Sequence, residues 1–164
     1  MTVNTMNGTD AMTMHESAPL AFARSAIDLL AKFPRAVLDL GLRVGVGMVF
    51  LKSALTKLDD SWRVSDTAIA LFQDEYKVPL LPPEIAAYLG AANELFASLM
   101  IILGLGARLG AAALLGLVAV IQFLVYPGNW AEHLMWASLL VYVLTRGPGV
   151  LSADHLIARR LLGR

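Results

Sequence analysis

The stretch that decides the fold is Pro82–Leu105, PPEIAAYLGAANELFASLMIILGL, an almost entirely apolar segment with Glu94 near its middle. About twenty apolar residues, at a rise of ~1.5 Å each, cross the ~30 Å hydrocarbon core of a bilayer. A carboxylate halfway along such a helix is costly unless it is paired, protonated or turned toward a polar cavity. We therefore predict a membrane-spanning helix whose Glu94 faces inward, and the rest of the chain must supply a partner for it.

The composition places the whole chain in the membrane class. Of its 164 residues, 57% are hydrophobic and 16% are charged, and the mean hydropathy is +0.64. These values lie outside the usual balance of soluble proteins, and the length fits a single domain. The formal net charge of zero gives no reason to expect nucleic acid as a partner. Without cysteine, this chain has no disulfide, thiolate metal ligand, iron–sulfur ligand or thiol redox chemistry of its own.

The N-terminal segments are expected to lie outside the membrane core. Residues 1–19 are polar and predict a disordered tail. Leu20–Phe33 predicts a short amphipathic helix that is too charged to span and lies in the membrane interface. The alternative for the tail is a soft copper site formed by Met6, Met12, Met14 and His15.

Four apolar segments predict an all-α fold, a four-transmembrane-helix bundle preceded by the N-terminal amphipathic interfacial helix. In the first segment Arg43, Phe50 and Lys57 share one helical face, whereas Lys52 points the opposite way. The long polar connection after it carries five acids and is expected to fold over the bundle end as a lid. The expected parts are a tail over 1–19, a membrane domain over 20–156 with spans at about 36–55, 83–105, 107–126 and 130–145 and an outer loop at 56–82, and a basic tail over 157–164.

The charges at the segment ends predict one orientation. Basic residues flank the first span, occupy the tight turn between the second and third spans, and follow the fourth span. Because positively charged loops stay in the cytoplasm, both termini and the tight turn are expected there. The long loop and the Tyr126–Trp130 turn then face outward. The residues behind this prediction are Arg24, Lys32, Arg35, Arg108, Arg146, Arg159, Arg160 and Arg164.

Depth in the membrane suggests a partner for Glu94. Counted from the cytoplasmic edge, Arg43 lies ~12 Å deep and Glu94 ~16 Å deep at the rise of an α-helix. We therefore predict an intramembrane ion pair between Arg43 and Glu94, joined by Asp39. Such a pair either locks the helices in register or passes a proton, and buried ion pairs often specify packing rather than chemistry.

A second polar group is expected near the outer side. Lys57, Gln122, His133 and Trp136 can rim a pocket that suits a quinone or another small planar ligand. The alternative is an ordinary interfacial belt of aromatic and snorkelling residues. No metal site is expected, because the other histidines, His15 and His155, lie on the opposite side in this topology.

Several motifs in order resemble the DoxX family of small four-helix integral membrane proteins. They are RVGVGMVFLKSALTKL, LFQDEYKVPLLPPEIAAYLGAANEL, GLGARLGA, YPGNWAEHLMWASLL and GPGVLSADHL, which together cover roughly Arg43–Leu156. The common Ser-Gly before the lysine of the first span is Ser53-Ala54 here. The resemblance implies a four-span bundle and, for some members, a place as the membrane subunit of a thiosulfate–quinone oxidoreductase or of oxidative-stress complexes. By that analogy Lys57, Glu94, Gln122 and His133 are the family-like polar positions.

The expected function is that of a membrane subunit of a redox system that interacts with quinone, with a soluble or membrane partner protein supplying the electrons. Lys57 and His133 would bind the quinone carbonyls, Gln122 would orient the ring and Trp136 would pack on it. The chain itself is expected to be non-catalytic, with no covalently bound cofactor, in the bacterial inner (cytoplasmic) membrane. The alternative is a non-enzymatic small-solute carrier or a membrane scaffold or assembly factor. The sequence leaves the oligomeric state open.

Overall fold

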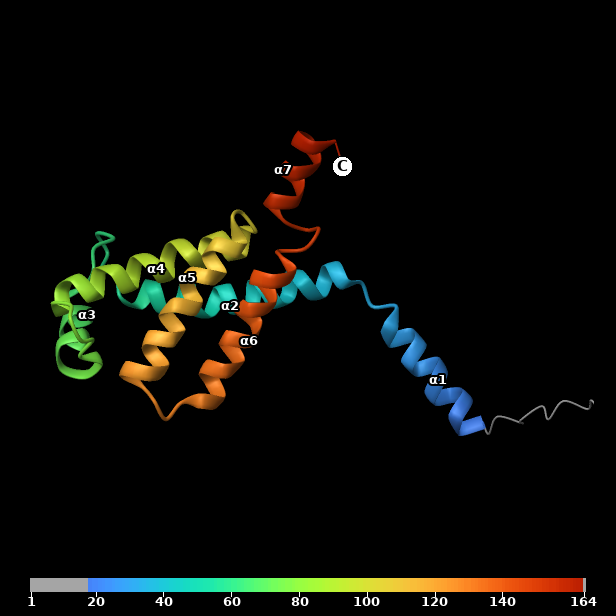
Figure 1. Cartoon of the computed structure of the whole chain (residues 1–164), viewed down its shortest axis with the longest axis horizontal. Coiled ribbons are helices and arrows are strands. Elements are labelled where there is room, and N and C mark those ends of the chain that lie inside the picture. The colour runs from blue at the N-terminus through green and yellow to red at the C-terminus, as the bar shows by residue number, and fades with distance from the viewer. Residues whose placement is uncertain (1–17, 164) are drawn as a thin grey trace, which may run out of the picture. The chain divides into compact units, whose positions relative to one another are not determined.

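The computed structural model describes residues 18–163, and nearly all of its ordered elements are helices (Figure 1). The expectation of an all-α protein is confirmed for these residues, whose one β feature is an isolated bridge between Leu58 and Val64. The predicted tail over 1–19 falls outside the described residues up to position 17, as do the alternative copper ligands Met6, Met12, Met14 and His15. The elements are α1 (Ala18–Ala31), α2 (Arg35–Thr56), α3 (Asp66–Leu71), η1 (Phe72–Tyr76), α4 (Pro83–Leu103), α5 (Ala107–Val120), η2 (Ile121–Val125), α6 (Trp130–Arg146) and α7 (Ala153–Leu162).

Helix α1 belongs to the first of two compact units, which ends at Pro34. It forms where the sequence predicts a short amphipathic helix, two residues earlier than expected. Its place in the membrane interface stays a prediction.

Four helices of the second unit form a closed bundle. Helix α2 packs against α4, α4 against α5, α5 against α6, and α6 returns to α2 (Figure 1). Their bounds fall within two residues of the four predicted segments when η2 is counted with α5. The core between them is apolar and includes Val46, Phe50, Ile101, Leu114 and Leu140.

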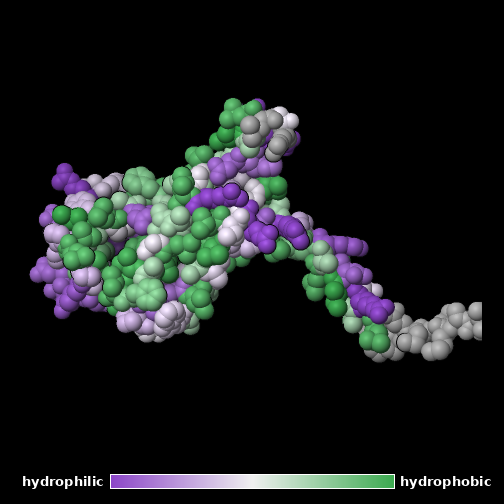
Figure 2. Space-filling view, in the orientation of Figure 1, coloured by the Kyte–Doolittle hydropathy of each residue, from purple (hydrophilic) through white to green (hydrophobic). Residues whose placement is uncertain are grey.

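Two of these helices are long and apolar enough to cross a membrane by length and composition, namely Pro83–Leu103 and Ala107–Val125. Helix α2 spans 22 residues but carries Arg35, Asp39, Arg43 and Lys52, and α6 has 17 residues. In Figure 2, hydrophobic residues cover much of the middle of the bundle. Hydrophilic residues gather over the end that holds α3 and at the opposite end near α7.

The tight turn between α4 and α5 depends on glycine and on a cap from α7. Gly104 ends α4 with φ +68°, and Leu105 N donates to Met100 O across 3.0 Å, which closes the helix end. The Asp154 carboxylate accepts hydrogen bonds from the backbone N–H groups of Gly106, at 2.8 Å, and Ala107, at 3.2 Å. A negative charge at a helix N-terminus is favourable, so α7 stabilises the start of α5.

The loop between α2 and α4 packs on the N-terminal half of α4. Ser65 caps α3 by accepting a hydrogen bond from Ala68 N. Val64, Ala68 and Phe72 are buried against Ala86, Ala87 and Ala91 of α4. Small residues on α4 let this segment, which we call the lid (residues 58–80), approach closely.

Glycine on α5 sets the distance between α4 and α5. A Cβ placed at Gly110 would lie 2.8 Å from Ala97 O and 3.1 Å from Met100 Cβ, whereas one at Gly116 meets nothing within 4 Å. We expect Gly110→Ala to destabilise the bundle by about 1–3 kcal/mol through overpacking. Gly116→Ala should leave the stability unchanged or raise it by up to ~1 kcal/mol, because alanine is the better helix former. Thermal unfolding in a mild detergent measures both, and equal effects would contradict the packing.

Candidate functional site

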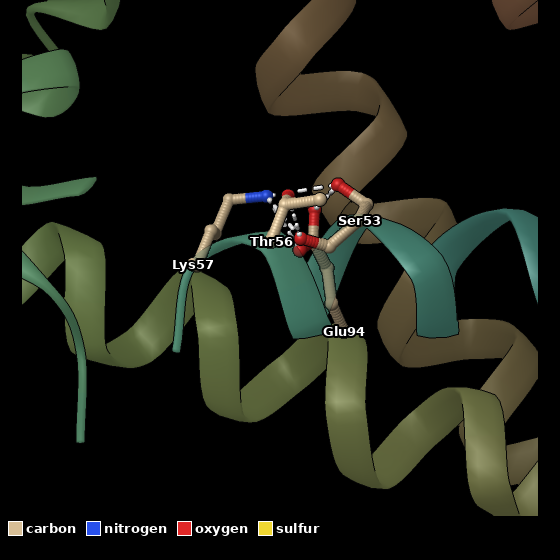
Figure 3. Close-up of polar contacts among 4 residues, drawn as sticks. All are labelled: Ser53, Thr56, Lys57 and Glu94. Carbon is tan, nitrogen blue, oxygen red and sulfur yellow. Dashed lines mark hydrogen bonds and ion pairs between the residues drawn. The ribbon is translucent and has the colours of Figure 1, made fainter. Parts of the chain in front are cut away.

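Glu94 pairs with Lys57 at the lid end of the bundle. Lys57 Nζ lies 2.7 Å from Glu94 Oε2, and the two residues are 7% and 4% exposed (Figure 3). Lys57 Nζ also donates to Ser53 Oγ at 2.8 Å and to Ser53 O at 3.2 Å. The Ser53 hydroxyl in turn donates to Glu94 Oε1 at 3.1 Å. All three N–H donors of the ammonium and both carboxylate oxygens therefore have partners, as a buried ion pair requires.

The expected Arg43–Glu94 ion pair is wrong. The Arg43 guanidinium donates to two backbone carbonyls that follow α6, Pro148 O at 3.1 Å and Leu151 O at 2.7 Å. Arg43 is 2% exposed and closes the end of the bundle opposite the lid by holding the segment that follows α6. Asp39 is not part of a shared network with Glu94 either, because it accepts a 2.7 Å hydrogen bond from the Tyr142 hydroxyl.

Arg43 and Glu94 do not meet because of the register in which α2 packs against α4. Gly47 lies against Ile102, and Ser53 bonds Glu94, so the antiparallel pair places Arg43 level with Gly104 at the end of α4. Arg43 and Ser53 are ten residues apart, which is ~15 Å along a helix. Helix α2 thus begins well beyond the end of α4, whereas the prediction placed the two helix ends at the same level.

His133 and Gln122 form a second buried pair. His133 Nδ1 lies 2.6 Å from Gln122 Oε1, and Gln122 Nε2 donates to Pro127 O at 2.9 Å. Because the amide nitrogen is used on Pro127, the amide oxygen must accept, and His133 carries its proton on Nδ1. Nε2 of His133 then has no hydrogen-bond partner within residues 18–163. Gln122 therefore orients the imidazole.

Trp136 stands one turn beyond His133 on α6 and contacts it. The ring centroids are 5.4 Å apart, and Trp136 also meets Phe50 edge-on at 5.4 Å. These contacts fix the indole between the core and the imidazole.

A cavity of about 190 Å³ lies between these two polar pairs. Lys57, Ser53 and Glu94 line one side, and His133 and Trp136 line another. Three of the four predicted ligand-binding residues therefore reach one cavity, while Gln122 supports it through His133. Segments from all four bundle helices and the lid contribute to the wall.

The lid closes the cavity with aromatic side chains. Tyr76 packs edge-on against Phe72 and Tyr126, with ring centroids 4.9 and 5.7 Å away. The Tyr126 hydroxyl donates to the Glu75 carboxylate, which ties the lid to the turn before α6. Burial raises the pKa of Tyr76, and the nearby Glu75 charge raises it further, so this phenol stays neutral at physiological pH.

Three residues of the site were not predicted from the sequence, namely Ser53, Phe72 and Tyr76. Ser53 precedes Lys57 by four residues and so shares its helical face, a spacing that could have identified it. No comparable signal existed for η2, a π-helical segment that holds Gln122. Such segments occur often at functional sites, but they arise from tertiary context.

The pairing can be measured by double-mutant cycles on unfolding free energy. Lys57→Met or Glu94→Gln alone should cost about 3–5 kcal/mol, because each leaves an unpaired buried group. The double variant should cost less than the sum by at least about 1 kcal/mol. The control cycle, Arg43→Met with Glu94→Gln, should be additive within about 0.5 kcal/mol. Additivity in the first cycle, or strong coupling in the second, would reverse the assignment of partners.

The DoxX family model matches residues 38–127, which is more than half of the chain. The matched region includes Lys57, Glu94 and Gln122 and ends before His133 and Trp136. No curated protein and no solved structure matches the chain. The resemblance inferred from the sequence motifs is thus confirmed: the chain belongs to the DoxX family and is a membrane protein.

Proposed function

We propose that this protein is the quinone-interacting membrane subunit of a redox system, to which a partner protein supplies electrons. The observation that carries the proposal is the cavity at the lid end of the bundle. It combines aromatic walls, a buried Lys57–Glu94 pair and a histidine nitrogen that has no hydrogen-bond partner among residues 18–163. The proposal has the chain in a bacterial inner membrane as a four-span bundle with both termini in the cytoplasm.

The distribution of charge on α2 and α6 supports four spans. Arg43 within α2 and Lys57 just after it are buried in the bundle, whereas Lys52 is exposed near the end of α2. Val37, Leu38, Met48 and Val49 are exposed on α2, as are Leu134, Met135 and Val141 on α6. Intramembrane charges face the interior of a bundle, and apolar side chains face lipid. Helix α2 is ~33 Å long and α6 ~25 Å long at the rise of an α-helix, close to the thickness of a bilayer core.

The proposed orientation can be tested without removing any native thiol, since the chain has no cysteine. We expect Ser61→Cys, in the exposed lid, to react with a membrane-impermeant maleimide in intact spheroplasts. Arg159→Cys, exposed on α7, should react only after the membrane is permeabilised. Reaction of both variants in intact cells, or of Arg159→Cys alone, would contradict the topology.

The size of the cavity suits the ring of a quinone. An engineered apolar cavity of about 150 Å³ holds benzene, and the cavity here is about 190 Å³. A substituted six-membered ring fits, with little room to spare. Trp136 and Tyr76 offer flat surfaces against it.

Polar groups at two walls have separate roles. His133 Nε2 is free to bind a quinone carbonyl once it is protonated, and Gln122 holds the imidazole in place. Lys57 has no spare donor in this arrangement, so the direct binding by Lys57 that the sequence predicts requires it to release Ser53. Its role is then to neutralise Glu94 and to keep this wall polar.

The proposed reaction is the reduction of quinone to quinol. Quinone gains two electrons from the reduced partner protein and two protons. One proton comes from protonated His133. The other comes from water, through a polar hollow of about 390 Å³ that shares Ser53, Lys57 and Tyr76 with the cavity. His133 and the water in the hollow regain these protons from the aqueous phase on the lid side.

Binding of quinone is the direct test. In quinone-free nanodiscs, a benzoquinone should quench the fluorescence of Trp136, and His133→Ala should weaken the affinity about three- to tenfold, as expected for one lost hydrogen bond. Gln122→Ala should weaken it similarly because the imidazole loses its orientation. The matched control is His155→Ala on α7, which should bind like the wild type. Absence of binding to the wild type would reject a quinone site and leave a carrier or scaffold role.

A further inference from the structure

The proposed site raises the question of where the hydrocarbon chain of a membrane quinone would lie. At about 190 Å³, the cavity has room for a ring and none for a long chain. Any chain must therefore leave the cavity through its wall. Two hollows adjoin that wall and share lining residues with it.

The hollow beside Lys57 does not suit hydrocarbon. It lies between the end of α2 and the lid, and its lining includes Thr56, Thr67, Asp74 and Glu75. Placing methylene groups against two carboxylates would desolvate charged groups without compensation. This hollow suits water and protons.

The second hollow is an apolar groove of about 200 Å³ between α5, η2 and α6. Leu115 and Ala119 line it from α5, Phe123 from η2, and Leu134 and Ala137 from α6. Phe123 and Leu134 are 66% and 63% exposed, so the groove opens on the surface assigned to lipid. Its rim is fixed by an edge-on contact between Phe123 and Trp130, whose ring centroids are 6.0 Å apart.

His133 and η2 stand between the groove and the cavity. His133 lines both hollows. Within η2, Ile121 and Val125 line the cavity, whereas Gln122 and Phe123 line the groove. The π-helical turn, closed by the 2.7 Å bond from Tyr126 N to Ile121 O, thus divides the two hollows where a ligand would bind His133.

We infer that the groove between α5–η2 and α6 is a lateral portal, through which a membrane-dissolved quinone inserts its ring and in which its hydrocarbon chain remains. The inference rests on the proposed quinone site. It adds the route by which the quinone enters and the place where its hydrocarbon chain lies. Ala119, Phe123 and Ala137 would contact the hydrocarbon chain of the quinone. The quinone ring would enter from the lipid and not from the lid side.

The test compares two ligands with the same ring, a dimethoxy-methyl-benzoquinone with a decyl chain and one with a methyl group in its place. Ala119→Phe fills the groove and should weaken binding of the decyl compound at least about tenfold, because its chain has no exit, which corresponds to ~1.4 kcal/mol. Affinity for the methyl compound should stay within about twofold. Ala112→Phe is the control. It lies two turns earlier on the same face of α5, is exposed, and should change neither affinity.

A milder variant keeps the inference testable if Ala119→Phe perturbs the fold. In the cysteine-free chain, Ala119→Cys should be protected from a hydrophobic maleimide by the decyl compound and not by the methyl compound. Ala112→Cys should be alkylated equally with either. Equal protection of the Ala119→Cys variant by both compounds would overturn the portal. Complete protection in lipid alone would overturn it as well, because a lipid acyl chain would then occupy the groove.

The outcomes separate this inference from the proposed function. If the wild type binds both compounds and Ala119→Phe still binds both equally, the quinone site stands and the portal is wrong. If the wild type binds neither compound, the quinone site itself fails and the portal fails with it.

Discussion

A charged pair inside an apolar bundle is stable only where each of its polar atoms has a hydrogen-bond partner. The ion pair between Lys57 and Glu94 therefore determines how the residues at the lid end are arranged. Ser53 completes the pair by accepting from lysine and donating to glutamate. That arrangement fixes the register of α2 on α4, because a shift by one residue would turn Ser53 away from Glu94. The lid then covers the end of the pair, and the small residues of α4 let it do so.

Among the described residues, the buried charged ones lie at the two ends of the bundle and not in its middle. Arg43 and Asp39 lie at the end near α7. Arg43 donates to two backbone carbonyls after α6, and Asp39 accepts from the Tyr142 hydroxyl. Lys57, Glu94 and His133 serve the opposite end. The middle of the bundle between them is filled by apolar residues such as Phe50 and Leu114. The polar contacts at one end therefore hold chain segments together, and those at the other end line the cavity.

The cavity at the lid end is asymmetric in a way that matters for a ligand with a polar head and an apolar chain. Its Lys57 side adjoins a polar hollow, and its His133 side adjoins an apolar groove. Water and hydrocarbon would thus approach from different directions. Gln122 contributes by directing His133, since its amide is committed to Pro127 and to the imidazole.

The sequence by itself determined the helices, the inward face of α2 and the family, because apolar periodicity, glycine and proline signals and ordered motifs are local properties. It placed Arg43, Phe50 and Lys57 on one buried face and left Lys52 exposed, as the structure has them. Only the tertiary structure decided the partner of Glu94, the π-helical turn at Gln122 and the division between cavity and groove. Partner choice depends on the stagger of antiparallel helices, and a stagger of eight residues moves a side chain by ~12 Å without changing any local pattern.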